Sequence, residues 1–281
     1  MKFLTIYNEK GGTGKTTLTS LFCSWLSYRV EERVVALDLD FPSFQLDAMR
    51  QNDMKVFSDL LKNNPSSPVV RMCQEHEPFL LGKINEKNSM FTQSDLTSIG
   101  NTLRRMRDEE GYLLLDFPGR YFGGDAQGHG EDAISFLSRN GLIDLVVFPI
   151  DSDRQSVASA LDISFRIRKA AQEGGHKQDV LFLWNREAQK ERKGRKDWYS
   201  DSERRFAELG IPVAGDRVHD ILIARRDIGT FGFIRNTLCW PLQNINKACP
   251  NIENIFKEIK ARVDGTWTET MKEEIYGQRK Q

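Results

Sequence analysis

The stretch Asn8-Glu9-Lys10-Gly11-Gly12-Thr13-Gly14-Lys15-Thr16-Thr17 follows an apolar segment, residues 3–7, and precedes a segment with apolar residues at helical spacing. A glycine-rich turn that ends in Lys-Thr at the start of a helix lets backbone N–H groups and the helix dipole hold phosphates. The sequence therefore predicts a strand, a phosphate-binding loop and a helix in that order.

The loop departs from the strict pattern G-x-x-x-x-G-K-[ST], because Glu9 stands where that pattern has its first glycine. It matches instead the variant K-G-G-x-G-K-[ST], in which a second lysine, Lys10, lies five residues before Lys15. The wider stretch, N-x-K-G-G-x-G-K-T-T, resembles the deviant Walker A motif of the ParA/MinD superfamily. Within that superfamily the layout is similar to the short, Soj-like partition ATPases, since no helix-turn-helix segment precedes the loop.

This resemblance implies ATP and Mg²⁺ as ligands and gives each loop residue a role. Lys15 is expected to contact the β- and γ-phosphates, Thr16 to bind Mg²⁺ and Thr17 to contact the α-phosphate. Lys10 is expected to act across a two-fold dimer on the partner's nucleotide, as an arginine finger does in GTPases. The other predicted nucleotide contacts are Gly11, Gly12, Thr13 and Gly14.

Length and composition favour one compact domain. The chain has 281 residues, only 9 prolines and no low-complexity run, so we expect a single ATPase domain over residues 1–265 and a polar, frayed tail over 266–281. The 40 basic and 40 acidic residues give a formal charge of zero, which excludes steering of a polyanion by overall charge. Any binding to DNA or membrane must use a local patch.

The cysteines and histidines do not predict a metal cluster. The four cysteines lack C-x-x-C spacing and the four histidines are scattered, which favours reduced thiols. No apolar run reaches the roughly 18 residues of a membrane span, and the first strand leaves no room for a signal peptide. We therefore expect a cytoplasmic protein.

Strands and helices alternate along the chain. Continuous apolar runs predict strands at residues 2–7, 33–37, 112–115, 145–149 and 180–184, and helical spacing predicts helices near residues 16–29, 56–62, 93–107, 155–172, 201–209, 221–226 and 252–263. Segment 43–109 is assigned only loosely. The alternation predicts an α/β fold with a doubly wound, mainly parallel sheet flanked by helices, as in P-loop NTPases.

Acidic residues end two of these strands, where ligands bind in open parallel sheets. Asp116 closes an apolar run, which is the Walker B pattern, so we expect it to bind Mg²⁺ through a water. Asp38 and Asp40 follow the second strand, and resemblance to the D-x-D-P motif gives Asp40 the role of orienting the attacking water. Phe41 departs from that motif by intervening before the proline.

Two further segments are assigned from the resemblance. Asp116-Phe117-Pro118-Gly119, together with the glycine-rich loop that follows up to Gly130, is similar to switch II. Asn185 and Arg186 end a strand where the family binds adenine, and Pro212 and Val213 match its apolar adenine wall. Asn185 as an ordinary turn residue remains an alternative.

The resemblance also implies a task. A ParA-like protein forms an ATP-dependent homodimer that binds non-specific DNA through phosphate contacts. This dimer partitions plasmids, chromosomes or mobile elements. It is released from DNA when a ParB-like activator speeds its slow ATP hydrolysis. The ATP state would then associate with the nucleoid. The candidate DNA-binding residues are Lys190, Arg192, Lys193, Arg195, Lys196, Arg225 and Arg226. A solvated basic loop is an equally good interpretation of these residues.

Two alternatives stay open. A MinD-like protein would bind membrane or cargo through a C-terminal amphipathic helix, and residues 252–259 do form an apolar stripe. Glu253, Glu258 and the polar tail weaken attraction to membrane, so we expect core packing there and no stable membrane association. A P-loop metabolic ligase with a substrate pocket in segment 43–109 is the second alternative. A nitrogenase iron protein and a bacterial tyrosine kinase are disfavoured, because paired cluster cysteines and a C-terminal tyrosine cluster are lacking.

Overall fold

A computed structural model describes residues 1–40, 43–84, 92–118, 132–187, 196–219, 237–238 and 251–277. The strands over these ranges are β1 (Lys2–Ile6), β2 (Val34–Asp38), β3 (Leu80–Lys83), β4 (Tyr112–Asp116), β5 (Leu145–Ile150), β6 (Asp179–Glu187) and β7 (Val218–His219). The helices are α1 (Lys15–Arg29), α2 (Gln45–Asn63), α3 (Pro68–Glu75), α4 (Gln93–Met106), α5 (Ala133–Arg139), α6 (Arg154–Glu173), α8 (Lys196–Glu208), α11 (Ile252–Val263) and α12 (Glu269–Tyr276).

Within the described residues the strands form one sheet in the order β3-β2-β4-β1-β5-β6-β7. Every neighbouring pair is parallel. The order reverses direction around β1, so the chain winds outward to both sides of the strand that enters the phosphate loop. The predicted α/β fold with a doubly wound parallel sheet is confirmed.

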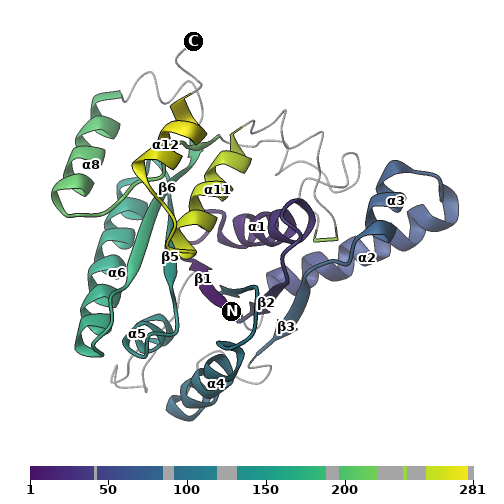
Figure 1. Cartoon of the computed structure of the whole chain (residues 1–281), viewed down its shortest axis with the longest axis horizontal. Coiled ribbons are helices and arrows are strands. Elements are labelled where there is room, and N and C mark those ends of the chain that lie inside the picture. The colour runs from purple at the N-terminus through teal and green to yellow at the C-terminus, as the bar shows by residue number, and fades with distance from the viewer. Residues whose placement is uncertain are drawn as a thin grey trace.

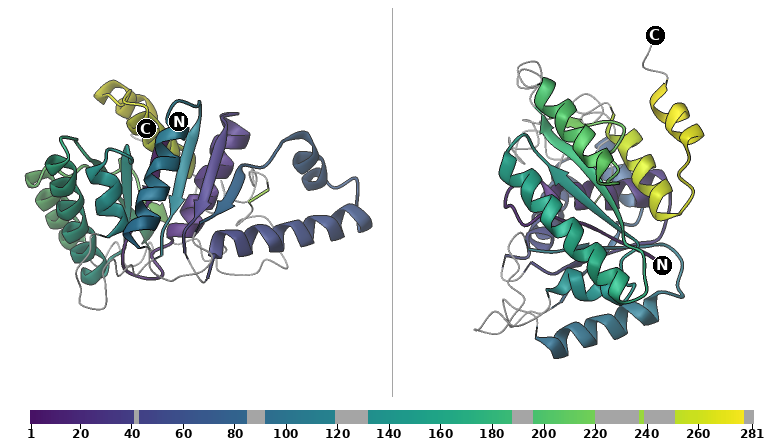
Figure 2. Two further views of the ribbon diagram at one scale, coloured as in Figure 1. Left: turned by 90° about the horizontal axis from the view of Figure 1, so that it is seen from below. Right: turned by 90° about the vertical axis from the view of Figure 1, so that its left-hand side faces the viewer.

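Helices cover both faces of this sheet, and the two views of Figure 2 show the layers. One core packs α4, α5, α6 and α8 against the sheet, and the other packs α1 and α11 against the opposite face. Alternate residues of β1 divide between them, since Phe3 belongs to the first core and Leu4 to the second. Burial on both faces explains why the central strands are continuous apolar runs.

The structure extends the predictions in segment 43–109. Helix α2 runs from Gln45 to Asn63, much longer than the predicted helix at 56–62, and strand β3 was not predicted. Figures 1 and 2 show α2 and α3 reaching beyond the β3 edge of the sheet. Only Leu46 and Asp53 of α2 are buried, so the helix has little apolar periodicity from which to predict its length.

The predicted frayed tail contains a helix. Thr268 caps α12 by accepting a hydrogen bond from the Met271 N–H, and the Tyr276 hydroxyl donates to Glu258 of α11 at 2.7 Å. The Tyr276 ring also leaves no room for a side chain at Gly215. The tail is therefore ordered at least to Gly277, because a polar helix is held by specific long-range contacts.

Candidate nucleotide-binding site

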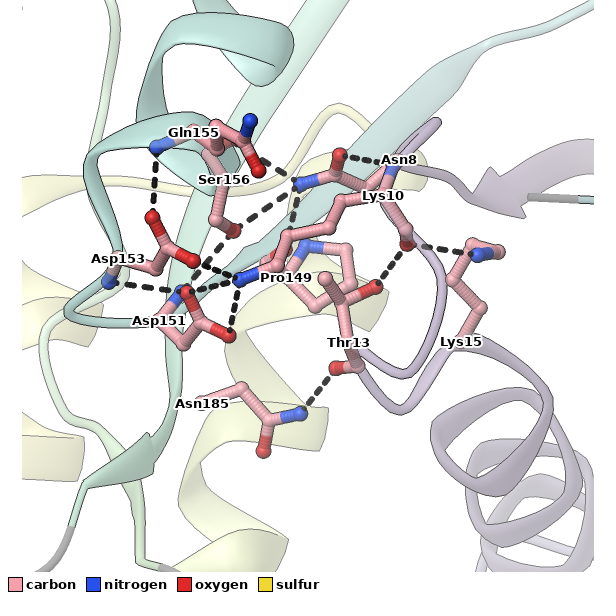
Figure 3. A network of polar contacts seen from close by, with 10 residues as sticks. All are labelled: Asn8, Lys10, Thr13, Lys15, Pro149, Asp151, Asp153, Gln155, Ser156 and Asn185. Atoms are coloured by element: carbon pink, nitrogen blue, oxygen red, sulfur yellow. Dashed lines mark hydrogen bonds and ion pairs between the residues drawn. The ribbon is translucent and has the colours of Figure 1, made fainter. Parts of the chain in front are cut away.

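The glycine-rich loop connects β1 to α1 at the carboxyl edge of the sheet (Figure 3). Gly14, the N-cap of α1, has a φ of 89°, and Gly12 has a φ of 76°. Both values lie in the left-handed region that glycine adopts without strain. The amide of Asn185 lies 2.6 Å from where a Cβ on Gly14 would stand, so both the backbone conformation and the available space require glycine there.

Lys15 is the first residue of α1 and is 7% exposed. Its ammonium donates a hydrogen bond to the Lys10 carbonyl at 3.3 Å, across the turn of the loop. Burial lowers the pKa of this ammonium, while the nearby carboxylates of Asp116 and Asp40 act in the opposite direction. Lys15 is thus a partly desolvated cation held over the loop, and its contact with phosphates stays a prediction.

Asn8 anchors the start of the loop and is fully buried. Its side-chain amide donates to the Pro149 carbonyl at 3.0 Å and to the Ser156 carbonyl at 3.3 Å. Its side-chain oxygen accepts the Lys10 N–H at 3.0 Å. Asn8 therefore ties the loop to the end of β5 and the first turn of α6.

Lys10 is held by carboxylates of its own chain. Figure 3 shows its ammonium between Asp151 and Asp153, at 3.2 Å and 2.7 Å. Burial lowers the pKa of Lys10, but hydrogen bonds to Asp153 and Asp151 outweigh that effect and raise its pKa above the ordinary value. The resemblance implied a role across a dimer, and the structure adds this resting position within one chain.

Two strand-end carboxylates lie side by side, because Asp38 of β2 pairs in register with Asp116 of β4. Asp116 is fully buried, and neither of its oxygens has a hydrogen bond of normal geometry among the described residues, although the Thr16 hydroxyl lies close enough to favour the charged carboxylate. Burial raises the pKa of its carboxyl to about 8, with a further contribution from the charge on Asp38. The Thr16 hydroxyl and the Lys15 ammonium act against this shift.

Asp38 and Asp40 differ in what they contact. Both oxygens of Asp38 accept backbone N–H groups, from Asp40 at 3.1 Å and from Asp47 at 2.9 Å, so its carboxylate holds the start of α2. The Asp40 carbonyl accepts the Phe44 N–H, and Asp40 is half-buried at the same edge as Lys15 and Asp116. Asp38 is thus engaged by two backbone groups, and the role of Asp40 in orienting the attacking water stays a prediction.

Asn185 of β6 contacts the phosphate loop. Its amide donates to the Thr13 carbonyl at 2.6 Å, and the side chain is 5% exposed. In the described residues this contact joins β6 to the turn before Gly14. Asn185 therefore lies beside the phosphate loop, where a nucleotide would be bound.

Pro212 and Val213 are not brought to this edge. Val213 forms a bridge with Phe182, three residues before Asn185 on β6, and the strand partner of Asn185 is Val218. Three strand residues span about 10 Å. Pro212 and Val213 line a different pocket of about 700 Å³, between α8, α11 and α12.

Several predicted residues lie outside the described residues or have side chains that are not described. They are Phe41, Pro42, the stretch 119–130, Lys190, Arg192, Lys193, Arg195, Arg225, Arg226 and the helix at 221–226, together with the side chains of Arg186 and Lys196.

The apolar stripe of α11 is fully buried. Ile252, Ile255, Phe256 and Ile259 are each 0% exposed, and the Phe256 ring lies 5.1 Å from Phe22 and 5.9 Å from Trp25 of α1. The prediction that this stripe packs against the core is confirmed. Among the described residues, no helix is long and apolar enough to cross a membrane.

The phosphate loop, the lysine that precedes it and the strand-end carboxylates lie in the segment that a family model covers. Residues 4–128 match the model described as the CobQ/CobB/MinD/ParA nucleotide binding domain. This segment is similar to the nucleotide-binding domain shared by CobQ, CobB, MinD and ParA proteins. The resemblance inferred from the loop motif is confirmed, whereas no curated protein sequence matches the chain.

Solved structures with the same fold include ParA/MinD-type proteins. A structure described as pNOB8 ParA bound to nonspecific DNA is 17% identical, covers 95% of this chain and 99% of its own, and has a TM-score of 0.58. The MinC:MinD complex of Aquifex aeolicus is 15% identical, covers 93% of this chain and 96% of its own, and has a TM-score of 0.54. A putative plasmid partition protein of Borrelia burgdorferi bound to AMPPNP is 15% identical, covers 92% of this chain and 99% of its own, and has a TM-score of 0.52. At such identities the likeness shows the fold alone.

Sequence reasoning missed the residues that hold the loop from β5 and α6. Asp151 and Asp153 follow β5 directly, so the rule that drew attention to Asp38 and Asp116 applies to them as well. Arg166 lies in the middle of α6 and pairs with Glu9 of the loop. Only the three-dimensional packing of α6 beside the loop identifies that contact.

Proposed function

We propose that this ParA/MinD-type protein is a Mg²⁺-dependent ATPase that acts as an ATP-driven dimerisation switch and partitions DNA. The observation that carries the proposal is the buried Asp116 carboxylate, whose oxygens have no hydrogen bond of normal geometry among the described residues, beside the Thr16 hydroxyl and the Lys15 ammonium of the loop. A buried carboxylate without a donor is costly, and a bound cation removes that cost.

The donor set fits Mg²⁺, a cation that takes oxygen ligands and is commonly bound by one or two carboxylates, substrate phosphates and water. Asp116 and the Thr16 hydroxyl are the protein groups that would hold it. When bound, the cation neutralises charge on the phosphates. Lys15 would contact the phosphates, with Lys10 and residues 11–14 and 17 completing the loop contacts, while Asp40 would orient the attacking water and Asn185 would adjoin the base.

The pairing of Lys10 with Asp151 and Asp153 is compatible with a role across a dimer. Asp153 is half exposed and Lys10 a quarter exposed, and such ion pairs contribute little because solvent screening and side-chain entropy offset the attraction. A nucleotide polyphosphate on a second copy carries several negative charges and competes favourably for the ammonium. In the proposed cycle, Lys10 moves from its own carboxylates to the partner's nucleotide.

The DNA-binding step rests on the motif resemblance and on the basic residues at 190–196 and 225–226. A ParB-like activator would stimulate slow hydrolysis and release the DNA, and the protein would be cytoplasmic and associated with the nucleoid in its ATP state. The burial of the α11 stripe favours this proposal over a MinD-like membrane helix at residues 252–263.

The test is co-sedimentation with random-sequence DNA at low salt in the presence of MgATP or MgADP. We expect DNA binding with ATP alone, and its loss as salt rises, because phosphate contacts release counterions. Lys15→Ala is the control that removes nucleotide binding. Equal binding in both nucleotide states, or none in either, would refute the DNA switch, and vesicles of anionic lipid would then test the MinD-like alternative.

A further inference from the structure

Glu9, the residue that breaks the strict P-loop pattern, has a specific partner. Its carboxylate accepts a hydrogen bond from Arg166 of α6 at 2.7 Å. The other terminal nitrogen of the same guanidinium lies 3.1 Å from the Asp132 carboxylate. One arginine thus bridges the phosphate loop to the residue that begins α5.

Asp132 is the rigid end of this bridge. It is the N-cap of α5, and its carboxylate accepts the Ser135 N–H at 2.9 Å and the Ser135 hydroxyl at 2.8 Å. Its side chain is only 11% exposed, compared with 35% for Glu9 and 41% for Arg166. Arg166 is therefore fixed from the α5 side and restrains the more exposed Glu9.

The bridge completes a pattern in the first half of the loop. Three consecutive side chains, those of Asn8, Glu9 and Lys10, all bind groups on β5 or α6 or at the boundary between them. The pattern ends at Gly11, where a Cβ would meet no atom of the described residues within 4 Å.

We propose that Arg166 is a positioning residue for nucleoside triphosphate binding, which restrains and neutralises the Glu9 carboxylate beside the phosphate loop. Without Arg166, an unpaired carboxylate would lie next to the loop and repel a polyphosphate. ATP carries one more negative charge than ADP, so the repulsion acts more strongly on ATP. This inference rests on the nucleotide binding proposed above.

The experiment is a titration of AMPPNP and ADP, each with Mg²⁺, into the whole chain by calorimetry. Arg166→Gln should weaken AMPPNP binding roughly threefold to tenfold and ADP binding less. This is the effect expected of one unit charge acting on the phosphates at about 10 Å through a partly aqueous medium. The difference should shrink as salt rises. Glu9→Gln combined with Arg166→Gln should restore wild-type affinity, because the net charge beside the loop is then the same as in the wild type, while Asp132 keeps its hydrogen bonds from Ser135.

Lys169→Gln is the matched control, since it removes an exposed cation from the same helix and should change neither affinity. Thermal unfolding without nucleotide checks that each variant folds. Wild-type protein that binds neither nucleotide would refute the proposed function itself. If the wild type binds nucleotide and Arg166→Gln binds it with the same affinity, the positioning role of Arg166 is overturned. The role is also overturned if Arg166→Gln loses affinity equally for AMPPNP and ADP and the double substitution does not restore it.

Discussion

Replacing Asp116 with asparagine should stabilise the nucleotide-free protein and abolish its response to Mg²⁺. The wild-type carboxyl has an ordinary pKa of 3.8 and a pKa of about 8 in the fold, chiefly because it is buried. The folded state therefore binds the proton more tightly than the unfolded state. Between about pH 4 and pH 8 the free energy of unfolding falls as pH rises, and asparagine removes this dependence.

The two pKa values set the magnitude. At pH 7.5 the unfolded chain has lost this proton, whereas the folded protein mostly keeps it. Keeping the proton costs the folded state at most about 5 kcal/mol, because pH 7.5 lies well above the ordinary pKa of 3.8 and each pH unit corresponds to about 1.36 kcal/mol. The buried asparagine amide has no partner either, which costs about 1–3 kcal/mol. The free energy of unfolding of Asp116→Asn should therefore exceed that of the wild type by about 2–4 kcal/mol. Because 1 kcal/mol shifts the melting temperature by roughly 2–4 °C, the melting temperature should rise by at least about 4 °C. At pH 5 the gain should vanish.

Thermal unfolding of both proteins at pH 5 and pH 7.5, with and without MgAMPPNP, measures this effect. Asp38→Asn is the control, because burial raises the pKa of Asp38 as well but two backbone N–H groups stabilise its charged form, so its replacement should stabilise the protein less than Asp116→Asn does. An Asp116→Asn protein that melts below wild type at pH 7.5, or that keeps its full stabilisation by Mg²⁺ and nucleotide, would refute the reasoning.

Four other substitutions test separate parts of the site and fold. Lys15→Ala should abolish nucleotide binding in calorimetry, since it removes the buried cation over the loop. Lys10→Ala should keep ATP binding and lose the ATP-dependent dimer in size exclusion; a dimer that persists would remove the proposed role across the interface. Asp40→Ala should accumulate the ATP dimer, and normal turnover would show that another group orients the water. Phe256→Ala should cost about 3–5 kcal/mol in urea unfolding, because its ring is fully buried against α1.

The central sheet could be predicted because its strands are buried on both faces. Strands such as β4 and β5 are buried along their whole length, which leaves an uninterrupted apolar run in the sequence. Strand β3 lies at the edge of the sheet and Leu80 is 59% exposed, so its four residues carry no such signal. Helix α12 buries no residue, and its polar contacts to α11 include those of Tyr276 with Glu258 and of Asn254 with the Ile275 carbonyl, which no local pattern predicts.

The same contrast holds for the candidate site, where the loop residues are contiguous in the sequence and their partners are distant. The phosphate loop is a contiguous motif, so its residues and their chemistry follow from the sequence. The partners of the loop come from far along the chain, because Asp151 and Asp153 lie more than 140 residues after Lys10. No spacing rule gives which helix packs beside a loop, and Arg166 is accordingly visible only in the folded chain.

Two of the side chains that anchor the loop, those of Asn8 and Lys10, differ in how readily their contacts can break. Asn8 is fully buried and bonded to backbone carbonyls, so breaking its contacts would leave buried polar groups without partners. Lys10 is held only by partly exposed ion pairs, which exchange at little cost. A loop with a fixed backbone and a releasable lysine can bind nucleotide in a preformed cradle while one side chain changes partners. If this is correct, Asp151→Asn combined with Asp153→Asn should leave nucleotide affinity unchanged and favour the ATP dimer.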